Sequence, residues 1–94
     1  MLDNSLSEIN FPELAFPCRY PIKVMGLNQN DFLDMVIGIL TRHISYLSMD
    51  DFSSRTSSGG KYISISVMFM AESREQVDAL YKELAENIRV LTAF

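Results

Sequence analysis

Cys18 and His43 are the only thiol and the only imidazole in the chain, and both residue types carry out nucleophilic or acid–base catalysis. A cysteine becomes a strong nucleophile when a nearby imidazole takes its proton. The predicted fold brings the two residues to the same edge of a sheet. However, no motif for an oxyanion-binding loop surrounds Cys18. We therefore predict a half-buried structural thiol, a helix-terminal histidine and no catalytic residue.

Other residues with metal-binding or phosphate-binding chemistry do not form a complete site. Zinc sites need several Cys or His ligands at set spacings, whereas the chain has one of each. Asp50 and Asp51 are adjacent, and neighbouring strand residues point to opposite faces, so we interpret this pair as a solvated edge. Gly59-Gly60-Lys61 lies between two predicted strands, without the helix start that receives phosphate. We predict no metal ligand and no cofactor-binding residue.

Length, charge and cysteine content favour a small cytoplasmic domain. The chain has 94 residues and a formal net charge of −4, which argues against broad binding to nucleic-acid phosphates. Small secreted domains usually carry several disulfides, which a single cysteine cannot form. Met1–Ser5 lacks the basic and apolar regions of a signal peptide, and no apolar run approaches the roughly 20 residues of a transmembrane helix. We expect no membrane association.

Apolar periodicity predicts a first strand and then a helix. Cys18–Gly26 alternates with period two, which is typical of a strand with one buried face, and Gly26 should end it. Phe32–Ile44 carries apolar residues at helical spacing. Asn28 or Asn30 can cap this helix, because a short side-chain oxygen accepts from the free amides of a helix start.

A hairpin is predicted in the middle of the chain. Tyr46–Ser58 is a polar edge strand whose apolar residues change parity before Phe52, so we expect a β-bulge at the two adjacent aspartates. Ser57–Gly60 forms the turn, because its glycines supply positive φ without steric cost. Lys61–Ala71 has the clearest alternation in the chain and predicts a strand with one buried face.

A second helix and a short strand complete the domain. Ser73 and Gln76 have the capping-box spacing of a helix start, and Ile88–Phe94 is the last strand. This order, with right-handed crossovers, predicts an α+β ferredoxin-like βαββαβ fold: a four-stranded antiparallel sheet in the order 4-1-3-2 with two helices on one face. Residues 18–94 would form this single domain, after a partly ordered arm, residues 1–17, that either docks its aromatic side chains or frays. The expected core comprises Ile22, Val24, Phe32, Val36, Leu40, Ile63, Ile65, Val67, Val77, Leu80 and Leu84.

Five short motifs occur in order over roughly residues 11–94. They are Phe11-Pro12, Lys23-Val24-Met25-Gly26, Gly60-Lys61-Tyr62-Ile63-Ser64-Ile65-Ser66, Glu75-Gln76-Val77 and Leu80-Tyr81-Lys82-Glu83-Leu84. This ordered set resembles the YbeD-like family of small bacterial proteins of unassigned function. The resemblance implies a ferredoxin-like fold, similar to ACT-type regulatory domains, and no catalytic residues. ACT domains bind amino acids near the loop after the first strand, often through Asp-x-Pro-Gly, and Gly26–Asp31 lacks the Pro-Gly step.

The sheet face opposite the helices carries residues that core burial does not explain. Met68 and Met70 stand beside two serines on this face; serines leave space for an incoming group, and methionine adapts to varied partners. The candidate interaction face comprises Lys23, Met25, Tyr62, Ser64 and Ser66. RNA-recognition modules stack bases on aromatic residues of this face, but Ser64 occupies one such position and Tyr20 has core parity.

We expect a non-catalytic regulatory or adaptor module that binds a protein partner, a second copy of itself, or a small metabolite at a dimer interface. A weak single-stranded nucleic-acid-binding protein is the alternative, and an enzyme ranks third. An oligonucleotide titration at low and high salt separates the first two, because contacts with phosphate weaken steeply with salt.

Overall fold

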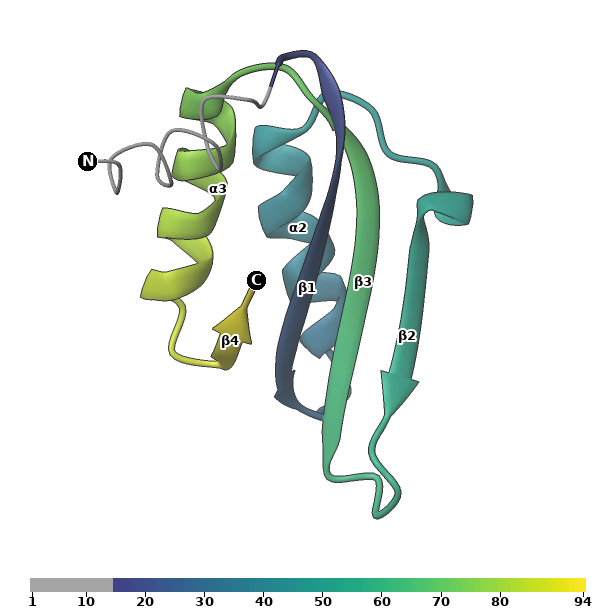
Figure 1. Cartoon of the computed structure of the whole chain (residues 1–94). Helices are drawn as coiled ribbons and strands as arrows, with labels where there is room; N and C mark the ends of the chain where they lie inside the picture. Colours follow the sequence, from purple (N-terminus) through teal and green to yellow (C-terminus); the bar gives the residue numbers. More distant parts are fainter. Residues whose placement is uncertain (1–14) are drawn as a thin grey trace, which may run out of the picture.

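The computed structural model describes residues 15–94 and contains one antiparallel sheet with two helices packed against one of its faces (Figure 1). The strands lie in the order β2-β3-β1-β4, so the predicted 4-1-3-2 order and ferredoxin-like fold are confirmed. The elements are β1 (Cys18–Leu27), α2 (Phe32–His43), a 3-10 helix (Met49–Asp51), β2 (Phe52–Thr56), β3 (Tyr62–Ala71), α3 (Arg74–Glu86) and β4 (Val90–Ala93). Of the predicted arm, residues 1–14 lie outside the described residues, and Phe16 packs against the core.

The core lies between the sheet and the two helices, because period-two alternation turns every second residue of β1 and β3 toward them. Of the predicted core residues, all except Ile63 are buried; Ile63, near the start of β3, is half-buried and packs against the core. The buried hydrophobic residues are Ile22, Val24, Phe32, Val36, Ile39, Leu40, Ile44, Ile65, Val67, Phe69, Ala71, Val77, Leu80 and Leu84.

The predicted strand over residues 46–58 is shorter in the structure, and the predicted β-bulge is wrong. A 3-10 turn over Met49–Asp51 precedes β2. This turn accounts for the shift of the apolar residues from odd to even positions before Phe52. Ser48 caps this turn by accepting a hydrogen bond from the Asp50 amide at 3.2 Å, which satisfies an amide that a helix start leaves free. β2 therefore begins at Phe52, whose side chain packs against the core.

Gly26 does not end β1 but lies buried within it. A Cβ atom at this position would lie 2.4 Å from Cε1 of Phe32 and 2.7 Å from the Arg89 carbonyl oxygen. The Phe32 ring can pack directly on the strand only because Gly26 has no side chain. The pairing of β1 with β4 also shifts register between Met25 and Gly26, so the glycine marks an irregularity inside the sheet.

The predicted cap of the first helix is wrong, whereas that of the second is confirmed. The N-cap of α2 is Asp31, and its side chain makes no capping hydrogen bond. Asn28 instead donates through Nδ2 to the Gly60 carbonyl at 3.0 Å and joins the loop after β1 to the β2–β3 turn. Ser73 caps α3 by accepting from the Gln76 amide at 3.1 Å. The last strand is shorter than predicted, because Asn87 closes a turn before Val90.

Candidate binding site on the open face of the sheet

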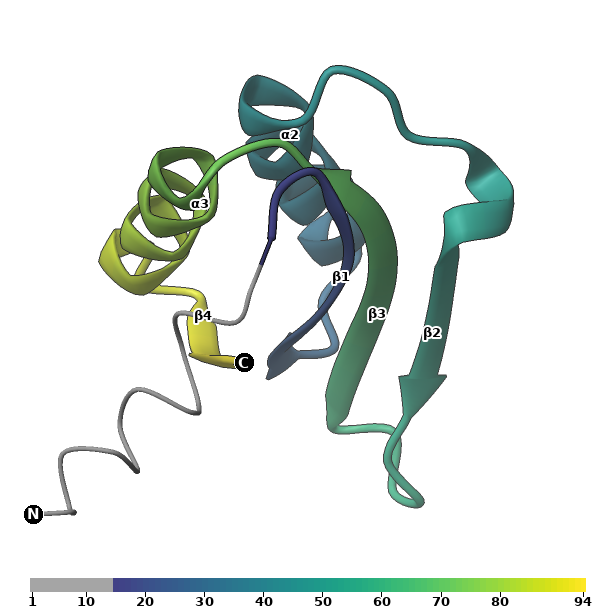
Figure 2. The ribbon, with the colours of Figure 1, turned by 45° about the horizontal axis from the view of Figure 1, so that its top comes forward.

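Among residues 15–94, no helix covers the face of the sheet turned away from α2 and α3 (Figure 2). All five residues of the predicted interaction face lie there on the two central strands. Their pairing places Lys23 opposite Ser66, Met25 opposite Ser64, and Leu27 opposite Tyr62. Side chains of directly paired residues project from the same face, so these residues form one continuous surface.

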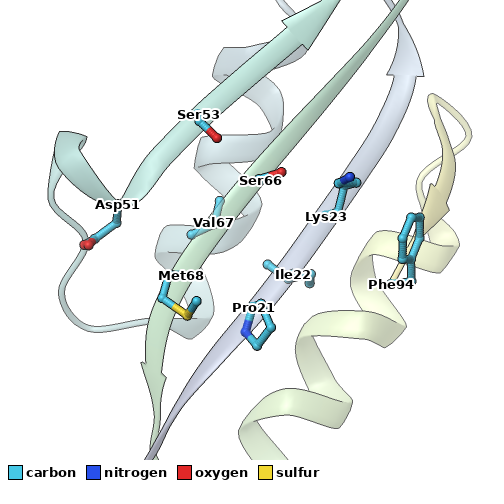
Figure 3. A pocket seen from close by; sticks show the side chains of 9 residues that line it. All are labelled: Pro21, Ile22, Lys23, Asp51, Ser53, Ser66, Val67, Met68 and Phe94. Carbon is cyan, nitrogen blue, oxygen red and sulfur yellow. The ribbon is translucent and has the colours of Figure 1, made fainter.

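The first of two adjoining hollows on this face is mostly apolar and has a volume of about 420 Å³. Pro21 of β1 and Met68 of β3, which pair directly, form part of its wall (Figure 3). Phe94 forms another part, because its backbone exchanges hydrogen bonds of 2.7 and 2.9 Å with Lys23. The ammonium group of Lys23 lies 5.9 Å from the centre of the Phe94 ring, a cation–π distance. The other lining residues are Ile22, Asp51, Ser53, Ser66 and Val67.

The second hollow is polar and has a volume of about 230 Å³. Its lining consists of two cationic residues and four serines: Lys23, Arg55, Ser53, Ser54, Ser64 and Ser66. In the sheet, Ser53 pairs with Ser66, and Arg55 pairs with Ser64. Lys23, Ser53 and Ser66 also line the apolar hollow. The two hollows are therefore contiguous, with an apolar and a polar compartment side by side.

The positive charge of the polar compartment is not neutralised by carboxylates of the described part of the chain. Within residues 15–94, no ion pair involves Lys23 or Arg55. Asp51, the one carboxylate side chain among the described residues that line the two hollows, accepts a hydrogen bond from the Ser48 amide at 2.9 Å. This compartment is thus suited to an anionic group supplied by a ligand or partner.

The predicted interaction face does not include Ser53 and Arg55 of β2 or Phe94 beside β4, although these residues line the hollows. For β2, a signal was present in the sequence. Because Phe52 belongs to the core, alternation turns Ser53 and Arg55 to the open face. No comparable signal existed for Phe94, whose position depends on the irregular pairing of β4 with β1.

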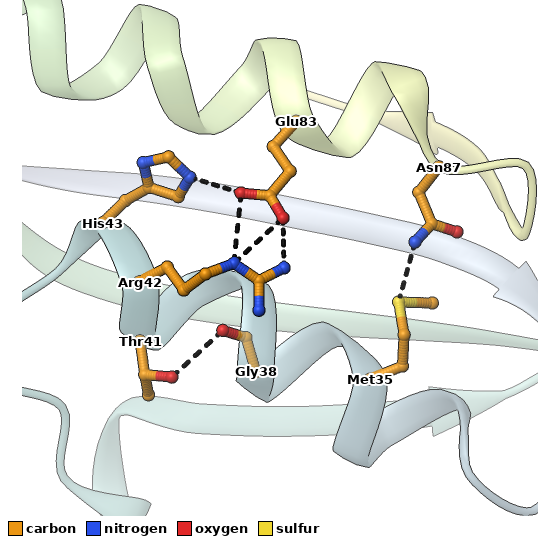
Figure 4. A network of polar contacts seen from close by, with 7 residues as sticks. All are labelled: Met35, Gly38, Thr41, Arg42, His43, Glu83 and Asn87. Atoms are coloured by element: carbon orange, nitrogen blue, oxygen red, sulfur yellow. Dashed lines mark hydrogen bonds and ion pairs between the residues drawn. The ribbon is translucent and has the colours of Figure 1, made fainter.

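The structure does not join Cys18 to His43 by a hydrogen bond. Cys18 lies half-buried at the start of β1, opposite Ala71. His43 Nε2 lies 2.7 Å from Oε1 of Glu83 on α3, which Arg42 also binds (Figure 4). The hydrogen bonds from Arg42 and then His43 lower the pKa of Glu83 to about 2. The imidazole thus takes part in a link between the two helices.

Tyr20 lies on the core side of β1, where it is half-buried against the core cluster. Its ring centre lies 5.8 Å from that of Phe69 and 6.5 Å from that of Tyr81. Burial, followed by a hydrogen bond with Tyr20, raises the pKa of Tyr81 to about 12. Tyr20 therefore supplies no aromatic platform on the open face, which leaves Tyr62 as the tyrosine exposed there.

Residues 15–94 contain neither a membrane-spanning helix nor a metal-binding cluster. None of the helices in this range has the length and apolar character needed to span a bilayer. In the same range, no three Cys, His, Asp or Glu residues gather closely enough to hold a metal ion.

Comparisons with known proteins place the chain in a family. The model of a protein family of unknown function, DUF493, matches residues 12–94. A UPF0250 protein of Ectopseudomonas mendocina is 38% identical over 85 residues, which cover 89% of this chain and 92% of the relative. A UPF0250 protein of Shewanella sediminis is 38% identical over 87 residues, which cover 90% of each chain.

Solved structures show the same fold at low sequence identity. Protein HP0495 of H. pylori has a TM-score of 0.67 and 16% identity, and the match covers 94% of this chain and 92% of that one. The ACT domain from GTP pyrophosphokinase of Chlorobium tepidum has a TM-score of 0.56 and 16% identity, with 81% and 94% covered. The resemblance to YbeD-like proteins and to the ACT fold is confirmed. The chain thus belongs to the DUF493 family, whose relatives bear the name UPF0250.

Proposed function

We propose that this protein is a non-catalytic regulatory or adaptor module that takes a protein partner or a small metabolite on the open face of its sheet. Its fold is similar to that of the ACT domain from GTP pyrophosphokinase, which supports a module that acts by binding. The fold likeness alone names no ligand, so the proposal depends on the surface chemistry of this chain.

The observation that carries the proposal is the pair of adjoining hollows on the open face. The apolar compartment offers Pro21, Met68 and Phe94, and the polar compartment offers Lys23 and Arg55 above serine hydroxyls. Apolar area beside a few convergent polar groups is the usual composition of a binding site. Because the contributing side chains stand mostly on paired strands, their relative positions are held by the sheet.

The positions of Cys18 and His43, the residues considered as nucleophile and base, support a non-catalytic role. Cys18 lies on the core side of β1, and His43 is held by Glu83 between the helices. Neither residue lines the hollows of the open face.

The proposal is tested with a double variant of the open face, Lys23→Glu with Ser66→Arg. The full chain is used as bait in a native extract, and captured proteins and bound metabolites are identified by mass spectrometry. The double variant places a negative charge in the polar compartment and a bulky side chain over its floor, so specific capture should be lost. Circular dichroism should remain that of the unchanged protein, because both side chains lie outside the core.

A matched control makes the same two changes of charge on the opposite, helical layer of the molecule. Lys82→Glu with Ala79→Arg alters two exposed positions of α3, and this variant should capture everything that the unchanged protein captures. If the open-face variant and the α3 variant behave alike, the open face is not the binding surface.

Single-stranded nucleic acid remains the second candidate for the same face. Tyr62 is 39% exposed there, and Lys61 lies 5.5 Å from its ring centre, an arrangement on which a base can stack. The net charge of −4 opposes this function. Oligonucleotide binding that falls steeply between low and high salt would support it.

A further inference from the structure

We propose that the polar compartment binds the phosphate group of a small phosphate monoester whose organic part lies in the adjoining apolar compartment. This inference rests on the proposed function and names the class of ligand that the open face takes. It follows from the arrangement of cations, hydroxyls and apolar side chains around the two hollows.

The cations flank a floor of serines. Ser66 lies between Lys23 and Ser53 in one row of paired residues, and Ser64 adjoins Arg55 in another. Lys23 and Arg55 are thus two strands and two residues apart, and strand spacings of about 4.8 Å with a rise of about 3.3 Å place their Cα atoms roughly 12 Å from each other. Both side chains are long and line the same hollow, so their charged ends can approach one anion from opposite sides.

The serine hydroxyls of the floor are available to a ligand. None of the hydroxyls of Ser53, Ser64 and Ser66, the serines that alternation turns to the open face, forms a hydrogen bond with another residue of the described range 15–94. A hydroxyl donates one hydrogen bond, and several donors around one point suit a group with several acceptor oxygens.

A phosphate monoester matches this set of donors better than a carboxylate does. It carries about −1.5 to −2 charge near pH 7 and three strong acceptor oxygens, whereas a carboxylate carries one charge and two oxygens. Two cations and several hydroxyls therefore find partners on a single phosphate. Arginine binds phosphate through its planar fork and lysine acts as a point charge.

The neighbouring compartment accounts for the organic part of the ligand. It shares Lys23, Ser53 and Ser66 with the polar compartment, and its wall continues over Pro21, Met68 and Phe94. Its volume of about 420 Å³ lies in the range of small-molecule pockets, about 300–1,000 Å³. An aromatic or aliphatic group joined to the phosphate would cover this apolar wall.

The test is a titration of the full-length, 15N-labelled protein in phosphate-free buffer, followed by amide chemical shifts. Phenyl phosphate should shift the amides of Lys23, Ser53, Ser64, Ser66 and Phe94. Inorganic phosphate should shift only the amides of the polar compartment. Its affinity should be about fivefold lower than that of phenyl phosphate, because it lacks the apolar contact. Benzoate should also bind more weakly, by about tenfold, because it lacks a charge and an oxygen.

Single substitutions test whether Lys23 and Arg55 bind the phosphate group. Lys23→Gln and Arg55→Gln should each weaken the binding of phenyl phosphate by about tenfold, as expected for the loss of one hydrogen bond to a charged group. Lys82→Gln, on α3, removes the same charge from the opposite layer and should leave the affinity unchanged. Spectra without ligand establish that each variant is folded.

Four results would overturn the inference. They are the absence of shifts on the open face at millimolar phenyl phosphate, equal affinity for benzoate, unchanged affinity in both glutamine variants, and tighter binding of oligothymidylate than of phenyl phosphate. Phenyl phosphate can fail to bind while the Lys23→Glu and Ser66→Arg double variant still loses its captured partner. In that case only the proposed ligand class is wrong. If that double variant also keeps every partner, the proposed function fails as well.

Discussion

Gly26 shows how one residue controls the contact between a helix and the sheet. Its lack of a side chain lets the Phe32 ring lie directly on β1, and the Arg89 carbonyl oxygen also lies close to where a Cβ would be. The guanidinium of Arg89 lies 5.9 Å from the same ring and donates to Asp31 at 2.8 Å. The start of α2 is therefore tied to the residues before β4 through Phe32 and Arg89.

Gly26→Ala should destabilise the protein by about 1–3 kcal/mol, because the added methyl group overpacks a contact with a buried ring and a backbone carbonyl. The free energy of unfolding is measured by denaturation in guanidinium chloride. Gly38→Ala is the matched control, since nothing lies within 4 Å of a Cβ at this position inside α2. The control should stabilise by about 0.5–1 kcal/mol, as alanine favours helices over glycine. Equal effects of the two substitutions would refute this account of Gly26.

At the scale of single elements, β3 has two faces with different tasks. Ile65 and Val67 point into the core, and Ser64 and Ser66 point to the open face. The strand lies between β1 and β2, so it stabilises the domain with one face and contributes the floor of the polar compartment with the other.

Substitutions on the two faces of β3 should therefore differ in their effect on stability. Ile65 is fully buried, and Ile65→Ala should cost about 2–5 kcal/mol, from lost burial and from the cavity left behind. Ser66→Ala, one residue along the strand, should change the free energy of unfolding by less than about 0.5 kcal/mol. Both values come from urea denaturation followed by circular dichroism. A cost below about 1 kcal/mol for Ile65→Ala would contradict the assignment of the two faces.

Polar contacts join the C-terminal end of α2 to α3. Glu83 of α3 binds Arg42 and His43 of α2, and Gln76 donates to the His43 carbonyl at 2.8 Å. Arg42 and His43 share the Glu83 carboxylate (Figure 4), so its ionisation should contribute to stability.

The contribution of Glu83 should depend on pH. Its pKa in the folded protein is about 2, below its ordinary value of 4.5, so its contribution is fully present above the ordinary value and is lost as the pH falls from about 4.5 toward 2. Glu83→Gln should cost about 0.5–1 kcal/mol at pH 7, the scale of a solvent-accessible ion pair, and less at pH 3. Thermal unfolding across this pH range measures the difference. A constant difference between the two proteins from pH 7 to pH 3 would exclude the ionised carboxylate as the cause.

At the scale of the whole molecule, the two layers differ in their electrostatics. On the helix layer, Arg42, Arg74 and Lys82 each pair with a carboxylate of α3. On the sheet layer, Lys23 and Arg55 have no such partner within residues 15–94. A chain with a net charge of −4 thus presents a locally cationic hollow, and ligand binding there should weaken as salt screens these charges.

The sequence by itself determined the strand and helix order, the sheet topology and nearly the whole core. These features follow from local patterns, because alternation and helical spacing tell which side of each element is apolar, and right-handed crossovers then leave few topologies. The same alternation placed Lys23, Met25, Tyr62, Ser64 and Ser66 on one face, and the structure brings them together there.

Only the tertiary structure decided how the edges of the sheet complete the site. Alternation after Phe52 turns Ser53 and Arg55 to the open face, but only the register of β2 on β3 places them opposite Ser66 and Ser64. Phe94 reaches Lys23 because β4 shifts its register beside Gly26. These outcomes depend on pairing between residues far apart in sequence and on the space left by one missing side chain, and neither is encoded in the periodicity of a single segment.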